Sequence, residues 1–514
     1  MCPVPGSLTG YARIRPSATS DQRGCSDRRA ARIGATAATL CAPRTGGSVT
    51  TTTPTRPSAA LDRFFQISER GSTIGTEIRG GLVTFVTMAY IVILNPIILS
   101  TPDVNGDTLP GAAVAASTAL TAGVMTILFG IITRLPFAFA AGLGINAFLA
   151  FTVVGQVSWR EAMALVVING LIIVLLAATG LRKLIFDAVP VQLKLAITVG
   201  IGLFIAFIGF VNAGFVTPTE GGSPPVDLGQ GGSVASLATV VFVITLLLGG
   251  VLISLKVKGA ILIALVAGTV LAAILNLIWP FGLDFGFANG IVALPDLSLI
   301  GAVDFGFDLG KVGVVALIMF VFTLVFSNFF DAMGTMTGLA KEAGLADAKG
   351  DFPRIKSALV VEGVGAVVGG STSSSSATVF IESGSGIGEG ARTGFATVVT
   401  GVLFLLAMFI TPITSLVPGA VAAAALVLVG AMMLSQIKHI DFTDFRVLLP
   451  VFLTATVMPM TYSIANGIGA GFVSWVVVNA LSGRAKTIHP LLWVVAAGFV
   501  LYFARGPLEA LFAG

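Results

Sequence analysis

The sequence predicts an all-α polytopic membrane protein, and three observations support that fold class. Charged residues make up 11% of the 514 residues, whereas soluble domains carry about 25%. Apolar residues make up 55% and gather in runs of about 20, the length that a spanning helix requires. Glycine is abundant, at 62 residues, as is typical where helices pack closely in lipid.

The first 60 residues differ from the rest of the chain. They hold eight Arg against two Asp, together with all three cysteines, Cys2, Cys25 and Cys41, and they lack the apolar run of a secretory signal. We expect a disordered tail over 1–60, or else a translation start near Val49. Because the tail carries the excess positive charge and every cysteine, we expect no nucleic-acid surface, no disulfide framework and no metal site in the remainder.

Fifteen apolar segments follow the tail. The first seven are 79–100, 111–133, 136–155, 161–180, 190–212, 233–255 and 259–279. After a loop at 280–310 come 312–336, 357–370, 376–389, 393–412, 417–436, 445–460 and 464–482. One more apolar stretch, 488–504, ends the series. The pattern therefore predicts seven spans, a long loop and seven further spans.

The charges in the loops predict the orientation. Lys and Arg concentrate in the loops that an N-inside topology places in the cytoplasm, as the positive-inside rule requires. The opposite loops, 101–110, 213–232 and 280–310, contain acids but no Lys or Arg. We therefore expect fourteen crossings of the cytoplasmic (inner) membrane with the N-terminus inside. Seven spans per half is an odd number, so the second half must be inverted, as in many secondary transporters.

Two segments are poor candidates for continuous helices, and they are the third members of their halves. They are "LPFAFAAGLGINAFLAFTVV" (135–154) and the tenth segment, which contains "GGSTSSSSATVFIESGSG" (369–386). Non-helical backbone at membrane depth occurs only where it is buried in protein or lines a cavity. We therefore expect both breaks to meet across a pseudo-two-fold axis and to line a site.

Six stretches, in order, carry a resemblance to a known family. They are "GGLVTFVTMAYIVILNPIILS" (80–100), "LPFAFAAGLGINAFLAF" (135–151), "KLAITVGIGLFIAFIGFVNAGFV" (194–216), "FDAMGTMTGLAKEAG" (330–344), "STSSSSATVFIESGSGIGEGARTGFATVVTG" (371–401) and "MPMTYSIANGIGAGFVSWV" (458–476). Over roughly 62–504 the chain resembles the nucleobase–cation symporters, specifically the AzgA-like permeases for adenine, guanine and hypoxanthine. It departs from the usual pattern at Ala141, at "SNFFDAMGT" (327–335) and at Glu362.

The resemblance implies a division into two moving parts. The core domain would comprise 61–180 and 311–412 (segments 1–4 and 8–11), and the gate domain 181–280 and 413–483 (segments 5–7 and 12–14). An extracellular loop at 281–310 would separate the halves, and 484–514 would hold an extra C-terminal apolar helix. Segments 3 and 10 would each contain a short strand, with substrate between these strands and segment 8.

Ionisable residues deep in the apolar segments are few. Asp331, Glu382 and Glu362 are the examples, while Glu161 and Glu389 lie near segment ends. A charged side chain at the bilayer centre costs at least ~2.5 kcal/mol, so such residues are functional candidates. Both histidines, His439 and His489, fall in predicted loops. Any proton coupling is therefore assigned to Asp331 and Glu382.

Two acids are the principal candidates for substrate binding. A carboxylate at Glu382 can accept two parallel hydrogen bonds from the edge of a base. The alternative is an acid that faces the exposed N–H groups of a helix terminus. Asp331 matches the substrate-contacting acid of the family motif. Its alternative role is structural, through hydrogen bonds to Ser327 or Thr335.

Five further residues complete the candidate site. Asn146 either donates to the base or caps the half-helix that follows. Phe380 either stacks on the purine or packs in the core. Thr378, Ser383 and Thr335 are candidates of second rank, and Glu362 is expected to bond within its own helix bundle.

These observations predict a secondary transporter that imports purine bases with protons by an elevator-like movement, with Na⁺ as the alternative coupling ion. No ATP-binding signature and no nucleophile–base pair are evident, so we expect neither a cofactor nor an enzyme. The alternatives are a uracil, xanthine or urate permease of the same fold and, more distantly, an anion transporter of related fold. Related transporters are often dimers, which makes a homodimer a further expectation.

Overall fold

The computed structural model describes residues 59–180, 188–219, 224–229, 232–234, 236–279, 290, 292–308, 312–347 and 351–504. The predicted disordered tail lies outside the described residues up to residue 58, and helix α1 (Ala59–Phe65) follows it. Much of the predicted loop at 280–310 also lies outside them.

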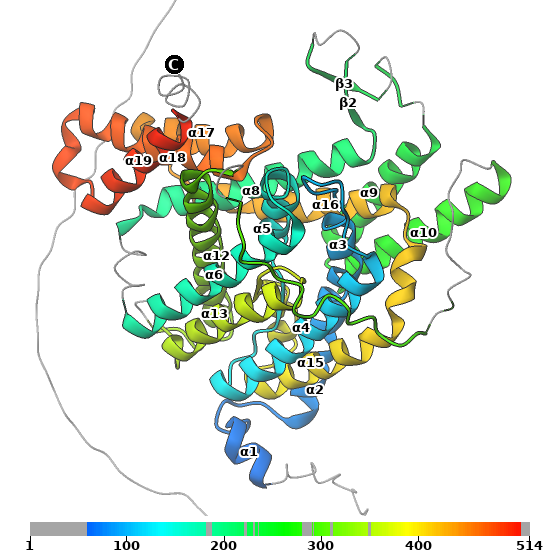
Figure 1. Ribbon diagram of the computed structural model, residues 1–514. Coiled ribbons are helices and arrows are strands. Elements are labelled where there is room, and N and C mark those ends of the chain that lie inside the picture. The colour runs from blue at the N-terminus through cyan, green and yellow to red at the C-terminus, as the bar shows by residue number, and fades with distance from the viewer. Residues whose placement is uncertain are drawn as a thin grey trace, which may run out of the picture. The chain divides into compact units, whose positions relative to one another are not determined.

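The elements of the first half follow the predicted segments closely (Figure 1). Segment 1 consists of α2 (Ile74–Met88) and α3 (Ile91–Ile98). Then come α4 (Gly111–Thr133), β1 (Phe139–Ala141), α5 (Leu143–Phe148), the π-helical turn η1 (Leu149–Val153) and α6 (Trp159–Thr179). Next are α8 (Val191–Asn212), the β2 (Val216–Pro218) and β3 (Val226–Leu228) hairpin, α9 (Leu237–Ser254) and α10 (Ala260–Ile278).

The second half repeats the order of helices and strand. It consists of α12 (Val314–Glu342), α13 (Ile355–Ser371), β4 (Ala377–Val379), α14 (Ser383–Gly388), α15 (Gly394–Ala407), the 3-10 helix η3 (Met408–Leu416), α16 (Gly419–Leu434), α17 (Phe445–Met460), α18 (Ile464–Asn479) and α19 (Pro490–Phe503). The chain is therefore mostly helical, with short strands inside segments 3 and 10, as predicted.

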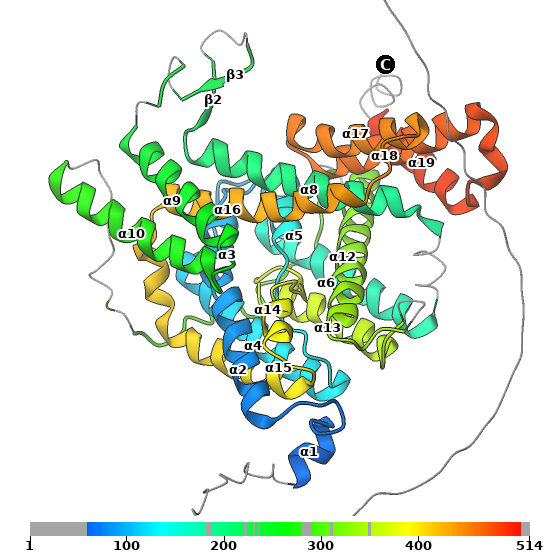
Figure 2. The same ribbon diagram turned by 180° about the vertical axis from the view of Figure 1, so that it is seen from behind.

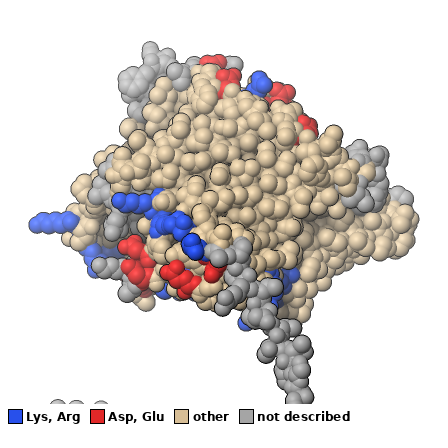
Figure 3. All heavy atoms as spheres, turned by 90° about the horizontal axis from the view of Figure 1, so that it is seen from below, with Lys and Arg blue, Asp and Glu red and all other residues tan. Residues whose placement is uncertain are grey.

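The described part of the chain contains 10 helices long and apolar enough to cross a membrane, and the protein is an integral multi-pass membrane protein. Shorter apolar helices cover Leu143–Val153, Phe445–Met460 and Pro490–Phe503. The 16 residues of α17 rise only about 24 Å, less than the ~30 Å of hydrocarbon. Fourteen crossings therefore stay a prediction. The surface in Figure 3 is consistent with a membrane protein, because charged side chains lie toward opposite edges and a broad uncharged band lies between them.

Close helix pairs build the bundle. α4 packs along α15, α6 along α13 and α8 along α16. Glycines permit the first of these contacts, because a Cβ at Gly401 would lie 2.7 Å from the carbonyl oxygen of Gly123, and Gly394 similarly abuts Gly130. Small residues at such crossings let helix backbones approach in lipid. Figures 1 and 2 both show α4 beside α15, far along the chain from each other.

A buried acid fixes the start of α15. Glu77 of α2 has no exposed surface, and its carboxylate accepts hydrogen bonds from the backbone N–H groups of Arg392 (2.9 Å), Thr393 (3.3 Å) and Ala396 (3.3 Å). The N–H groups of Thr393, the N-cap, and of Ala396 are donors that a helix start leaves without intrahelical partners, and Arg392 directly precedes the cap. Segment 1 is thereby tied to segment 11, just beyond the broken segment 10.

Candidate functional site

The two broken segments meet as a pair of antiparallel strands. β1 pairs with β4 in the register Phe139–Val379, Ala140–Thr378 and Ala141–Ala377, and all six residues are buried. Two backbone hydrogen bonds extend the ladder, from Phe380 N–H to Ala138 O and from Gly142 N–H to Ser376 O, each 2.9 Å. Each break therefore satisfies the backbone groups of the other, which explains how extended chain persists in a bundle inside lipid.

The serine run before β4 forms a buried turn. Ser373 to Ser376 are at most 1% exposed, and Ser373 and Ser375 take left-handed backbone conformations (φ 57° and 71°). The Ser373 hydroxyl donates to Leu299 O (3.3 Å), and that of Ser374 donates to Gly369 O (3.4 Å). Ser374 thus satisfies a carbonyl group in the last turn of α13, whereas the hydroxyls of Ser375 and Ser376 have no hydrogen-bond partner among the described residues.

Glu382 follows β4 and receives a hydrogen bond from segment 1. The Tyr90 hydroxyl donates to Glu382 Oε1 at 2.5 Å, and Tyr90 is only 1% exposed. Tyr90 lies between α2 and α3, and its side chain is buried in the bundle. A hydrogen bond to a carboxylate is short and strong. The sequence analysis did not single out Tyr90, although a buried tyrosine hydroxyl usually requires a partner.

Asp331 belongs to α12, which packs against both β4 and α14. Glu382 lies between β4 and α14, so the two acids belong to neighbouring, packed elements. Within the described part of the chain Asp331 makes no hydrogen bond to Ser327 or Thr335, the partners that a purely structural role requires. Asp331 and Thr335 lie one helical turn apart and are both partly exposed. The helix that carries Asp331 therefore packs beside the elements that flank Glu382.

Asn146 is held in a buried amide network. Its side chain donates to Asn95 Oδ1, and Asn95 donates in turn to Thr118 Oγ1 (2.7 Å) and Ser374 O (3.0 Å). Neither asparagine has any exposed surface. Asn146 does not cap α5, because Gly142 occupies that position. Asn95 escaped the sequence analysis, and its signal was an uncharged amide inside an apolar segment.

Of the other candidate residues in the described part of the chain, one has a free hydroxyl group in the paired strands and the rest contribute to the surrounding structure. Thr378 is 1% exposed, and its hydroxyl has no hydrogen-bond partner among the described residues. Ser383 Oγ accepts from Ala138 N–H at 2.9 Å and so ties α14 to β1. Phe380 is 7% exposed and belongs to the hydrophobic core. Glu362 is fully buried on α13.

The two acids near segment ends and the two histidines lie at helix ends or in ion pairs. Glu161 forms a capping box with Ser158 at the start of α6. Glu389 forms ion pairs with Arg79 (2.9 Å) and Lys258. His489 caps α19, and His439 ends the 3-10 helix Ser435–His439. Over the described ranges, no group of three or more His, Cys, Asp or Glu side chains could hold a metal ion.

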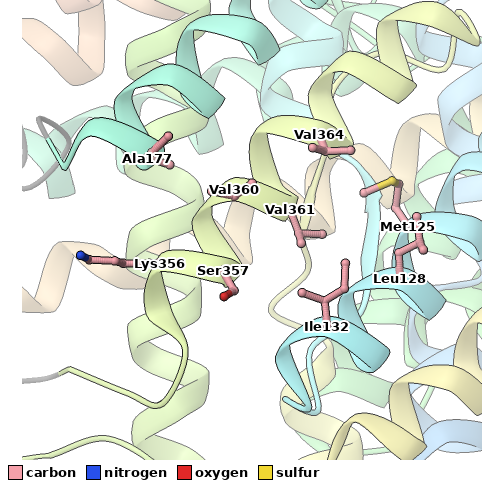
Figure 4. Close-up of a pocket in the computed structure, with 10 residues that line it drawn as sticks. Met125, Leu128, Ile132, Ala177, Lys356, Ser357, Val360, Val361 and Val364 are labelled. Atoms are coloured by element: carbon pink, nitrogen blue, oxygen red, sulfur yellow. The ribbon is translucent and has the colours of Figure 1, made fainter.

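A cavity of about 380 Å³ between α4, α6 and α13 has a different character (Figure 4). It is lined mainly by aliphatic side chains, and Figure 4 shows the amine of Lys356 pointing away from Val361 and Met125. It contains none of the candidate site residues. Its apolar lining offers little to orient a polar ligand, so we do not assign the site there.

Comparisons with known proteins concern the family and the fold of the chain. A model of the family described as "Permease family" matches residues 75–470. The chain is 38% identical to adenine permease AdeP of Escherichia coli (strain K12), over 88% of this chain and 97% of that protein. It is also 38% identical to guanine/hypoxanthine permease PbuG of Bacillus subtilis (strain 168), over 86% and 99%. The transmembrane domain of a cyanobacterium bicarbonate transporter, BicA, shares the fold, with a TM-score of 0.56, 15% identity and coverage of 77% of this chain and 97% of that domain.

Proposed function

Since this chain belongs to the nucleobase permease family, whose members are transporters and not enzymes, we propose that it imports adenine, guanine and hypoxanthine. The names of the two relatives at 38% identity support purine bases as the substrate class. The observation that carries the proposal is the β1–β4 pairing at the broken segments, with Glu382 directly after β4 and the Asp331 helix α12 packed against β4 and α14.

Recognition in this proposal is by hydrogen bonds to the carboxylate of Glu382. A carboxylate accepts two parallel N–H donors, which purine ring and exocyclic nitrogens supply. Thr378, in the strand that precedes Glu382, offers a buried hydroxyl group. Asn146 offers a buried carbonyl oxygen that has no partner among the described residues. Two acids disfavour an anionic substrate, because like charges would repel each other in the site. The shared fold with a bicarbonate transporter therefore does not extend to its substrate.

The same acids supply the proposed coupling to protons. An ionised carboxyl group is expensive to bury, and a proton removes that penalty. Arrival of a proton with the base would neutralise one of the two carboxyl groups while the site moves across the membrane, with Na⁺ as the alternative cation. The core domain that carries β1 and β4 would then shift against the gate domain, in a molecule whose N-terminus is inside.

Uptake measurements test the proposal. Proteoliposomes that contain the full chain should accumulate labelled adenine and hypoxanthine under an inward proton gradient, and a protonophore should abolish the accumulation. Glu382→Gln removes the charge with little change of shape and should reduce uptake to background. Glu69→Gln, an exposed acid near the start of the first span, is the matched control and should leave uptake unchanged.

Competition identifies the substrate class in the same assay. Excess unlabelled guanine should suppress adenine uptake, whereas uracil should not. Suppression by uracil alone would replace the purine proposal by a uracil permease. Accumulation that persists with the protonophore and requires Na⁺ would replace proton symport by sodium symport. Full uptake by the Glu382→Gln variant would disprove the assigned site.

A further inference from the structure

A polar groove lies at the far end of broken segment 3, separate from the two acids. Its volume is about 360 Å³, and its lining includes Phe151, Thr152, Gln156, Tyr462 and Asn466. We propose that this groove is a second, outer binding site for a neutral nucleobase, which docks there before it reaches Glu382. The inference rests on the proposed function and adds a site that this function does not require.

The aromatic side chains of the groove provide stacking surfaces. The rings of Phe151 and Tyr462 are 5.7 Å apart and nearly perpendicular (87°), and Phe204 contacts Tyr462 at 5.6 Å. Tyr462 is one of the few non-glycine residues with a left-handed backbone (φ 54°), in the tight turn between α17 and α18. Strained backbone of this kind recurs at ligand sites, because the surrounding structure must hold it. Planar heteroaromatic bases stack on such rings with little regard to sequence or substituents.

Three polar side chains of the groove, those of Thr152, Gln156 and Asn466, are available to a ligand. Within the described residues, the carboxamides of Gln156 and Asn466 make no hydrogen bond, and the hydroxyl of Thr152 is shielded from solvent without a partner. A carboxamide presents one donor and one acceptor side by side, the pattern that matches a purine edge. No lining residue is charged. The groove therefore suits an uncharged, planar ligand with donors and acceptors on its edge.

The position of the groove suggests its role. Phe151 and Thr152 lie in segment 3 and Gln156 follows it, whereas Tyr462 lies in the turn between segments 13 and 14 and Asn466 in segment 14. One part of the lining thus belongs to the proposed core domain and another to the proposed gate domain, while Tyr502 and Phe503 come from α19. In the predicted topology this end of segment 3 faces the outside. A base in the groove would therefore stand at the boundary that must open for it to reach the inner site.

Equilibrium binding of labelled adenine to the purified full chain tests the inference. We expect two sites per chain, one tight and one weak. Glu382→Gln should remove the tight site and leave the weak one. Asn466→Leu should weaken the second site at least ten-fold and leave the tight site in place. Asn105→Leu, an exposed loop asparagine, is the matched control and should preserve both sites.

The outcomes separate the two proposals. A single site that Glu382→Gln removes and Asn466→Leu leaves unchanged would overturn the outer site while the proposed function stands. No adenine binding by the unaltered chain would overturn the proposed function itself. If Asn466→Leu fails to fold, Gln156→Leu in the core part of the lining carries the same test, with the same ten-fold weakening expected.

Discussion

At the scale of single residues, the contact between Tyr90 and Glu382 determines which hydrogen-bond acceptors the carboxylate offers to a ligand. The phenol donates to Oε1, so one carboxylate oxygen already has a donor before a base arrives. Each carboxylate oxygen has two lone pairs, and Oε1 can therefore accept a second hydrogen bond. Tyr90 is thus a positioning residue, which holds the carboxylate in one orientation for the base.

We expect Tyr90→Phe to weaken adenine binding about ten-fold, because the substitution removes the donor and keeps the ring. Hydrogen bonds to charged groups are worth ~1.5–3 kcal/mol, and a ten-fold change in affinity corresponds to ~1.4 kcal/mol. Titration calorimetry on the purified protein measures the affinity. Thr87→Val is the control, because Thr87 hydrogen-bonds the backbone of Glu382 but not its carboxylate. Unchanged affinity in Tyr90→Phe would show that the phenol does not orient Glu382.

At the scale of elements, one amide side chain joins four segments. Asn95 of segment 1 contacts Thr118 on α4, Asn146 on α5 and the backbone of Ser374 before β4. Both breaks are therefore anchored to the same residue, which lies one turn beyond the junction between α2 and α3 that carries Tyr90. Segment 1 thus positions the acid through Tyr90 and the paired strands through Asn95.

Asn95→Leu should lower the unfolding temperature and abolish adenine binding. The substitution preserves approximate size but leaves the Ser374 carbonyl and the Asn146 amide buried without partners. Each unsatisfied buried group costs ~1–3 kcal/mol. Thermal unfolding in detergent, followed by intrinsic fluorescence, measures the loss of stability. The exposed Asn105→Leu should unfold at the temperature of the unaltered protein; equal temperatures for both variants would contradict the anchoring role.

Hydrophobicity along the chain predicted the elements well but not their contacts. The predicted segment 111–133 coincides with α4, and 190–212 differs from α8 by one residue. The strand breaks were predictable because Gly and Ser interrupt apolar runs. The hydrogen bond from Tyr90 to Glu382 joins residues 292 apart in sequence, which no local pattern encodes. Tyr90 and Asn95 were missed because uncharged polar residues are tolerated more readily in lipid than charges and give a weaker signal.

At the scale of the whole described molecule, the helix pairs occur in matching sets. α4–α15 joins segments 2 and 11, and α6–α13 joins segments 9 and 4, which are their counterparts seven segments away. The pair α9–α10 (segments 6 and 7) corresponds in the same way to α17–α18 (13 and 14). α8–α16 and β1–β4 each pair a segment with its own counterpart. This correspondence supports the inverted repeat and groups the helices as the proposed core and gate require.

The contacts between the proposed core and gate are those that an elevator movement would have to break. In Figures 1 and 2, α8, α9, α10 and α16 gather on one side, with α2, α4, α13 and α15 on the other. The loop between α9 and α10 crosses the division, where Lys258 pairs with Glu389 and Gly259 packs against Val86. A Cβ at Gly259 would lie 2.7 Å from Val86 Cγ1. An elevator movement must break both contacts in each transport cycle.

A disulfide between Val86→Cys and Gly259→Cys should therefore arrest transport. The three native cysteines all lie in the first 41 residues and can be replaced by serine, so the engineered pair would be the only thiols. Oxidation should stop adenine uptake, leave adenine binding intact and be reversed by a reductant. The left-handed backbone of Gly259 (φ 71°) makes a cysteine there costly by roughly 1–2 kcal/mol, so the reduced double variant is the reference for activity.

The control disulfide lies inside the proposed gate. A Cβ at Gly209 of α8 would lie 2.8 Å from Val427 Cγ2 of α16, so Gly209→Cys with Val427→Cys offers comparable spacing within one moving part. Its oxidation should leave uptake at the level of its own reduced form, because a rigid-body movement does not separate these helices. Continued transport by a fully cross-linked 86–259 pair would exclude an elevator, because core and gate would then be joined while the substrate still crosses.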